Sequence, residues 1–239
     1  MSPQPQPPPG SSPARGASSQ EAFAPEHGWC SQDVQRELPG LALLSNEILV
    51  GRAGSLTGSS PADISSRLRE LSNRLRGAAA VGMRREPIPV AYRVFFRHIG
   101  LDPENARTPI EAAVLERMLR GGFLSEGLLA DVLTIALIDT GVPVWALDAD
   151  TVDGPLGIRA SGAGERLGRS PEAPELPPGR LVIADASLPL AVLFGELAPG
   201  HEPRGRVRRL LLFALQVAGV PDLYVEEALW MCSAALESA

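Results

Sequence analysis

The sequence has no lysine, and all 22 of its positively charged residues are arginine. This bias is typical of a protein encoded in a GC-rich bacterial genome, so we take it as a sign of origin and not of chemistry. The 28 acidic residues give a formal net charge of −6. That charge excludes a generally basic nucleic-acid coat, although a local basic surface remains compatible with it.

Cysteine, histidine and long apolar runs are also scarce. Two cysteines are too few for a disulfide scaffold or a four-ligand zinc site, and no metal or other cofactor is expected. No segment approaches the roughly 18–20 uninterrupted apolar residues of a membrane span, and the first residues lack the features of a secretory signal. We therefore expect a bacterial cytoplasmic protein, and its oligomeric state stays open.

The length of 239 residues and the 44% hydrophobic content are enough for one sizeable core. Seven prolines, with glycine, serine and glutamine between them, fall within residues 1–28. Such a composition does not bury enough apolar surface to offset its ordering entropy. We expect residues 1–28 to be a disordered tail and residues 29–239 to form a single domain.

Helices are predicted mainly in the first half of the chain. Ser60-Pro61 and Thr108-Pro109 are typical helix starts, and each precedes apolar residues at a spacing of three and four. A further helix is expected over 90–99. Ser125 is expected to cap a helix that runs to about residue 139 and is apolar nearly all round, which predicts a central position.

Short apolar runs separated by proline, glycine and aspartate predict strands in the rest of the chain. One strand, or two, is expected over 41–50, and further strands over 144–147, 156–159, 180–184 and 190–194. Residues 207–217 favour a strand, with a helix as the alternative. Pro221-Asp222 is expected to open a closing helix. The order of elements predicts an α+β fold with mixed β-sheets and packed helices.

A longer stretch resembles a known family. The segment LADVLTIALIDTGVPVWALD (129–148) is similar, without a gap, to the B3 segment of the phenylalanyl-tRNA synthetase β subunit. Residues 151–159, Gly164-Glu165 and 178–185 resemble the B4 segment that follows, and 190–195 resembles its glycine-containing turn. Over roughly residues 85–215 the chain is most similar to freestanding B3/4-domain proteins.

This resemblance implies a function. In the synthetase this domain hydrolyses the ester of a wrongly charged tRNA, and freestanding members resemble trans-acting versions of it. The implied partner is the aminoacylated 3′ end of a tRNA. An aminoacyl ester is already activated, so a pocket that places the ester and one water is sufficient, and the absence of a Ser-His-Asp arrangement is no objection.

The sequence departs from the family at its pocket. The family's pocket asparagine falls on Thr134, its histidine on Trp145, and its glutamate within 210–213, which is apolar. Either the pocket is reshaped for a different, mis-attached or non-protein amino acid, or hydrolysis is lost and binding is retained. Trp145 would fill much of the space that a tyrosine ring uses.

Candidate site residues follow from the resemblance and from residue chemistry. We expect Thr134, Glu196 and His201 to be able to act on the ester or its water, while a backbone-bonded threonine and solvated polar residues are the alternatives. The candidates for substrate binding are Trp145, Arg107, Asp131, Asp148, Asp150, Arg159 and Gly195.

Each binding candidate has a structural alternative. Trp145 is a core residue in that reading, Asp131 satisfies backbone groups at a junction, and Asp148 and Asp150 form turns. Arg159 pairs with Glu165 across adjacent strands, Gly195 makes a tight turn, and Arg107 makes a fixed ion pair. Glu111 is expected to be a capping carboxylate.

Arg204, Arg206 and Arg208 belong to the densest basic run, and on a strand they would face one side. They are candidates for phosphate contacts with tRNA, or else form a charged edge that discourages strand pairing. Two other functions stay open: a non-catalytic tRNA- or RNA-binding module, and a small-molecule amino-acid-binding protein.

Overall fold

A computed structural model describes residues 23–51, 55–205 and 207–239. Most of the expected tail and Arg206 therefore lie outside the described residues. Within them the chain folds as two sheets and a layer of helices, which confirms the α+β class.

The larger sheet is antiparallel, with the strand order β1-β3-β8-β4. Its members are β1 (Glu26–His27), β3 (Ala42–Leu49), β8 (Arg209–Gln216) and β4 (Val144–Asp148). Residues 41–50, expected as one strand or two, form the single strand β3. The polar residues in its middle do not interrupt it, because Ser45 and Glu47 point to one face while Asn46 donates a hydrogen bond to Ser233 on the other.

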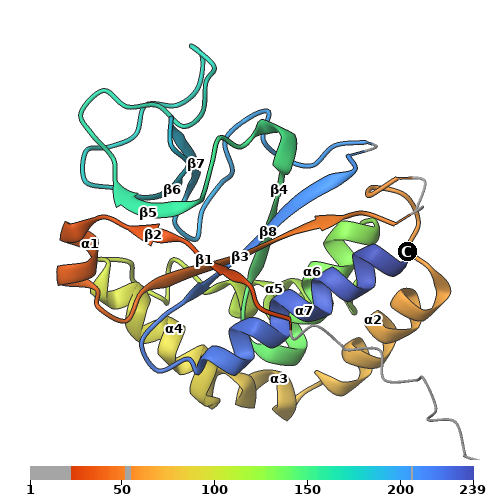
Figure 1. Cartoon of the computed structure of the whole chain (residues 1–239). Coiled ribbons are helices and arrows are strands. Elements are labelled where there is room, and N and C mark those ends of the chain that lie inside the picture. The colour runs from red at the N-terminus through yellow and green to blue at the C-terminus, as the bar shows by residue number, and fades with distance from the viewer. Residues whose placement is uncertain (1–22, 52–54, 206) are drawn as a thin grey trace, which may run out of the picture.

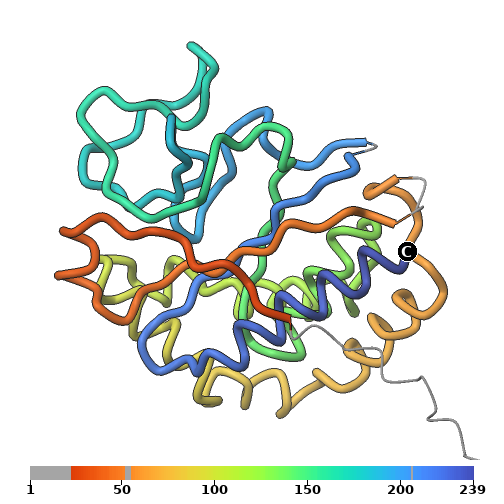
Figure 2. The backbone as a smooth tube through the Cα atoms, viewed as in Figure 1, coloured from red at the N-terminus to blue at the C-terminus, as the bar shows by residue number. Residues whose placement is uncertain are grey.

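The smaller sheet has the order β2-β5-β6-β7, with β2 (Trp29–Cys30), β5 (Gly157–Ala160), β6 (Leu181–Ala184) and β7 (Pro189–Val192). β2 pairs with β5 in parallel, and the other pairs are antiparallel. The chain from residue 26 to 30 thus passes from one sheet to the other (Figure 2). The expected domain boundary at Trp29 falls inside this paired segment, because Glu26 and His27 already bond to β3.

Seven α-helices and two short 3-10 helices complete the described part of the chain. They are α1 (Gln32–Glu37), α2 (Ala62–Arg74), α3 (Ala78–Gly82), η1 (Met83–Arg85), α4 (Pro87–His98), α5 (Pro109–Arg120), α6 (Leu128–Thr140), η2 (Ala149–Thr151) and α7 (Asp222–Ser238). In Figure 1 the helices α2, α3, α4 and α7 lie below the larger sheet, and the smaller sheet lies above its left half.

One helix start is as predicted and two are not. Thr108 and Glu111 form a reciprocal capping box at the start of α5, as expected for Glu111, and Gly121 ends that helix in the left-handed region at φ 79°. Ser60 and Ser125 do not cap α2 and α6. Both hydroxyls donate instead to the Asp131 carboxylate, and this charge-assisted contact holds them away from the backbone N–H groups that a cap would accept from.

α6 has the central position predicted from its sequence, since it contacts α2, α5, α7 and β4. The main core lies between the larger sheet and the helices. The α4 residue Tyr92 is almost fully buried in it, and its hydroxyl donates to the carbonyl of Leu215 at 2.7 Å. This packing fixes α4 against the end of β8.

Candidate functional site around Trp145

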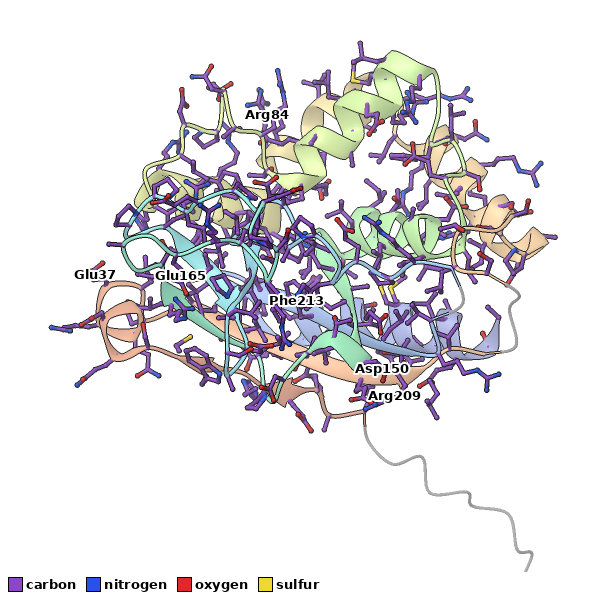
Figure 3. The ribbon with its side chains drawn as sticks, turned by 90° about the horizontal axis from the view of Figure 1, so that it is seen from above. Glu37, Arg84, Asp150, Glu165, Arg209 and Phe213 are labelled. Atoms are coloured by element: carbon purple, nitrogen blue, oxygen red, sulfur yellow. The ribbon has the colours of Figure 1, made fainter. Side chains whose placement is uncertain are left out.

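The central feature of the candidate site is a pair of stacked rings. Trp145 on β4 lies directly opposite Phe213 on β8, with ring centroids 5.5 Å apart and planes inclined by 14°. Asn46 reaches α7, so strand alternation places both rings on the opposite face of the sheet. Figure 3 looks down on this face, where Phe213 is near the centre.

A tight turn brings a third ring to the pair. The Gly195 N–H donates to the Val192 carbonyl at 2.8 Å, and Phe194 between them has φ 57°. A Cβ on Gly195 would lie 2.9 Å from the Val192 Cβ, which explains glycine at this position. The Phe194 ring meets Trp145 edge-on at 5.6 Å and also contacts the α4 rings of Tyr92, Phe95 and Phe96.

We call Trp145, Phe194 and Phe213 the aromatic site. Phe213 is buried, while Trp145 and Phe194 are half-buried, so part of each of these two rings stays accessible. None of the three side chains can titrate at ordinary pH. The site is therefore suited to stacking against a planar group, and not to proton transfer.

Thr134 lies on α6, next to the helix α5. Thr134 lines a hollow of about 60 Å³ on the α5 side of α6, together with Asp131, Arg117 and Glu116. Asp131 is buried, and its carboxylate accepts hydrogen bonds from the Ser60 and Ser125 hydroxyls and from the Glu126 N–H. Asp131 thus holds together the segments that meet at the start of α6, which is the structural alternative to a role in substrate binding.

A polar cluster lies where β4 ends. His201 is buried; its Nδ1 lies 3.0 Å from the Thr151 Oγ1, and its carbonyl accepts from the Asp148 N–H. Burial lowers the pKa of His201, and the nearby Asp185 offsets part of that effect. The side chain of Asp148 accepts from the Asp150 N–H, which is the turn role considered for it. Two candidates, His201 and Asp148, are therefore neighbours.

Other candidates are held in ion pairs. Arg159 and Glu165 pair as expected, with Nη1 2.8 Å from Oε2, but within one strand and its following loop and not across adjacent strands. Asp150 accepts from Arg209, which also pairs with Glu47 on β3. Figure 3 shows Glu165 on one side of Phe213 and Asp150 with Arg209 on the other.

The remaining candidates are exposed. Arg204 and Arg208 lie in the loop before β8 and not on a strand, so the expected alternation does not apply to them. Arg204 pairs with Glu202 in that loop. Glu196 follows the turn at Gly195, and its carbonyl accepts from the Val192 N–H.

Arg107 borders a separate hollow of about 280 Å³ between α3 and α5. It forms no ion pair with any residue in the described ranges, whereas its neighbours Arg84 and Arg93 both pair with Glu104 and Glu111. The fixed ion pair considered for Arg107 is thus not found in the described part of the chain.

A larger groove of about 920 Å³ lies between α1, the end of α4 and the loop before β6. Its rim carries charges of both signs, from Asp33 and Glu37 on one side and Arg180 on another. Its lining includes Leu193, the residue before Phe194. Neither Trp145 nor Thr134 borders this groove.

Sequence reasoning missed the partners of Trp145. Phe194 precedes Gly195, and only the glycine was considered there, because of its turn. Phe213 belongs to the run 210–213, which was considered only because it lacks the family's glutamate. Thr151 and Asp185 were also missed, because short polar residues in loops give no periodic signal. The adjacency of Phe194 to the family's glycine turn was the one available hint.

Part of the chain is similar to known proteins. Residues 91–196 match the B3/4 domain. The chain is 40% identical over 97 residues to the phenylalanine–tRNA ligase beta subunit of Xanthomonas oryzae pv. oryzae (strain MAFF 311018), which covers 39% of this chain and 12% of that subunit. The subunit of Xylella fastidiosa (strain Temecula1 / ATCC 700964) is 37% identical over 113 residues, or 44% of this chain and 13% of the relative.

Residues 91–196 are therefore similar to the B3/4 domain, and part of the chain is similar to the phenylalanine–tRNA ligase beta subunit. The aligned part spans only about an eighth of the length of these relatives. All three members of the aromatic site lie in or beside this domain, with Phe213 contributed from beyond its matched end.

The described ranges also bear on membrane insertion and metal binding. None of the described helices has the length and apolarity to cross a membrane. Nor do three or more His, Cys, Asp or Glu side chains there gather closely enough to hold a metal ion. Cys232 is buried, which raises the pKa of its thiol to about 12, and burial also raises that of Cys30.

Proposed function

We propose that this chain is a tRNA-binding protein whose aromatic site receives the aminoacylated 3′ end without hydrolysing it. The B3/4 domain and its similarity to a tRNA ligase subunit support tRNA as the partner. The half-buried rings of Trp145 and Phe194 provide surface on which a terminal base or an amino-acid ring stacks.

The observation that carries this proposal is the Trp145–Phe213 stack. Trp145 occupies the position at which the resemblance implies a histidine, and Phe213 belongs to the apolar run 210–213 within which it implies a glutamate. Side chains that could polarise a water are thus replaced by apolar ones. Thr134, at the third polar position, borders a different hollow. Binding then depends on stacking and on phosphate contacts, for which Arg204 and Arg208 are exposed.

A combined binding and cleavage experiment tests the proposal. Binding of uncharged and aminoacylated tRNA is measured at about 50 and 200 mM salt, where an interaction that involves several phosphates loses affinity steeply. We expect salt-dependent binding with no ester cleavage above the spontaneous rate. Arg208→Ser should weaken binding, whereas Arg69→Ser, at an exposed arginine on α2, should not.

The outcomes separate the remaining functions. Absence of tRNA binding at low salt overturns the proposal. If the protein is instead stabilised by a free amino acid, with no tRNA affinity, the small-molecule reading takes its place, and the groove between Asp33, Glu37 and Arg180 becomes the site to probe.

A trans-acting aminoacyl-tRNA deacylase is the second candidate. The observation that favours it is the contact between His201 and Thr151 beside Asp148. Asp148 and Thr151 follow Trp145 in the chain by three and six residues. Deacylation is assayed with a panel of mischarged tRNAs. Cleavage of one of them, reduced by His201→Gln or Glu196→Gln and unchanged by His98→Gln, would place the deacylase first.

A further inference from the structure

The helices carry two exposed apolar faces of opposite charge. The first surrounds the hollow between α3 and α5, which is lined by Val81 (62% exposed) and Met118 (51% exposed). Leu119, the next residue on α5, is 79% exposed. We call Val81, Arg84, Arg107, Leu115, Met118 and Leu119 the basic face. Exposed apolar side chains gathered beside a hollow are typical of an interaction surface.

The charge around this hollow is slightly positive although the protein carries a net charge of −6. Arg84, Arg93 and Arg107 lie here with two carboxylates, those of Glu104 and Glu111. Glu104 and Glu111 are already shared between Arg84 and Arg93. Arg107 borders the hollow and has no carboxylate partner among the described residues, so its charge is available to an acidic partner.

The second face is on α7. Leu223, Glu227 and Trp230 follow one another at spacings of four and three and so share one side of the helix. Leu223 is 68% and Trp230 53% exposed. α7 carries four carboxylates and no arginine. We call Leu223, Glu226, Glu227 and Trp230 the acidic face.

The two faces lie on different sides of the molecule. α6 packs against both α5 and α7 and lies between them. Figures 1 and 3 agree that α5 is behind α6 and α7 in front of it, and Figure 3 shows Arg84 at the α5 side. One copy therefore presents both faces outward at once.

We infer that the acidic face of one copy docks on the basic face of a second copy. The aromatic ring of Trp230 would enter the 280 Å³ hollow, with Glu227 beside Arg107. Such packing of an amphipathic helix into a groove is a common mode of recognition. A second copy is the favoured occupant because the chain supplies both charge-complementary faces, whereas each face meeting its own copy would oppose like charges.

Because the contact joins two different faces, it is heterologous and forms rings or open chains. The inference is independent of the proposed tRNA binding. The full chain at rising concentration in low salt should have a mass above that of one chain by light scattering, and added salt should lower it. Trp230→Glu and Met118→Glu should each weaken association by about tenfold or more, as for a central anchor of an interface.

Mixing gives the sharper test. Each variant keeps one intact face, so an equimolar mixture of Trp230→Glu and Met118→Glu should form a dimer and nothing larger. Leu49→Glu, which places a carboxylate at another exposed leucine, should associate like the wild type. Arg107→Glu and Glu227→Arg should each weaken association and, mixed, restore it, and circular dichroism confirms that every variant is folded.

A wild-type chain that stays monomeric at high concentration in low salt would overturn the inference. Two monomeric variants that do not pair on mixing would also overturn it. If the chain is monomeric and both Met118→Glu and Arg107→Glu reduce tRNA affinity, the basic face is an RNA surface, and self-association is again excluded.

Discussion

Trp145 and Phe213 occupy opposed positions on β4 and β8, and their rings stack 5.5 Å apart. Their contact brings together two departures from the family pattern, which are Trp145 in place of a histidine and an apolar run at 210–213 in place of a glutamate. A glutamate opposite Trp145 would place a carboxylate against an apolar ring, where its charge is costly to desolvate. An apolar residue opposite the indole removes that cost, so a tryptophan at position 145 is expected to occur together with an apolar residue at position 213.

The stack can be measured with a double-mutant cycle. Phe213→Ala should lower the free energy of unfolding by about 3–5 kcal/mol, because the side chain is buried. Trp145→Ala should cost less, because part of the indole is already in water. In the double variant we expect a coupling of about 0.5–1.5 kcal/mol, typical of an aromatic pair.

Urea unfolding of the four proteins measures this coupling. The control cycle combines Phe213→Ala with Leu223→Ala, at an exposed residue on α7, and should be additive. Additive effects in the Trp145–Phe213 cycle as well would contradict an energetic role for the stack.

The sequence predicted those elements that depend on neighbouring residues better than those that depend on residues far apart in the chain. α5 and α6 were predictable because a helical period and a terminal glycine are local signals. The strands β4 to β8 were bounded by local turn residues. The two-residue strands β1 and β2 were not predicted, since they are too short to show a period and exist only through their pairing with β3 and β5.

Long-range competition explains the errors at the site. Ser60 and Ser125 have the residue type of helix caps, but Asp131, 71 residues beyond the first, attracts both hydroxyls. Likewise, the resemblance placed Thr134 and Trp145 in one pocket. Whether one cavity joins them depends on how α6 and β4 pack against α5 and β8, which the residue pattern does not encode.

Asp131 should be a stability residue and not a binding residue. Asp131→Asn keeps one acceptor oxygen but loses the charge that receives three hydrogen bonds, and it should cost about 1–3 kcal/mol of unfolding free energy. The affinity for tRNA should not change. Asp63→Asn on the exposed start of α2 is the control for both measurements. A folded, equally stable Asp131→Asn protein with lost tRNA affinity would reverse this assignment.

Glu111 should govern stability at acid pH. Burial alone would raise its pKa, but hydrogen bonds from Thr108, Arg84 and Arg93 outweigh burial and hold the pKa below its usual value. A carboxyl whose pKa is lower in the folded state stabilises the fold above the unfolded pKa, and this contribution is lost as the pH falls through the folded pKa.

Glu111→Gln leaves the nearly buried Arg93 with Glu104 as its remaining charged partner, and it should cost about 1–3 kcal/mol at pH 7. The variant should then lose less stability than the wild type between pH 5 and pH 3. Urea unfolding at each pH measures this difference. Glu116→Gln, on the exposed side of the same helix, should keep the wild-type dependence.

His201 should contribute a second pH dependence, nearer neutrality. Burial lowers its pKa, while Asp185 and Glu202 act to raise it and Arg169 to lower it further. The folded protein thus binds the proton more weakly than the unfolded chain does. Stability is complete above the unfolded pKa of about 6.5 and falls as the pH drops through the folded pKa.

His201→Gln keeps a side chain that can bond the Thr151 hydroxyl and cannot titrate. Between pH 7.5 and 5.5 the wild-type protein should lose unfolding free energy, and the variant should lose less of it. His98→Gln, at an exposed histidine, should follow the wild type. Equal pH dependence in all three proteins would mean that the His201 imidazole is open to solvent. Its burial could then no longer be used to decide between a structural role and a deacylase role for this cluster.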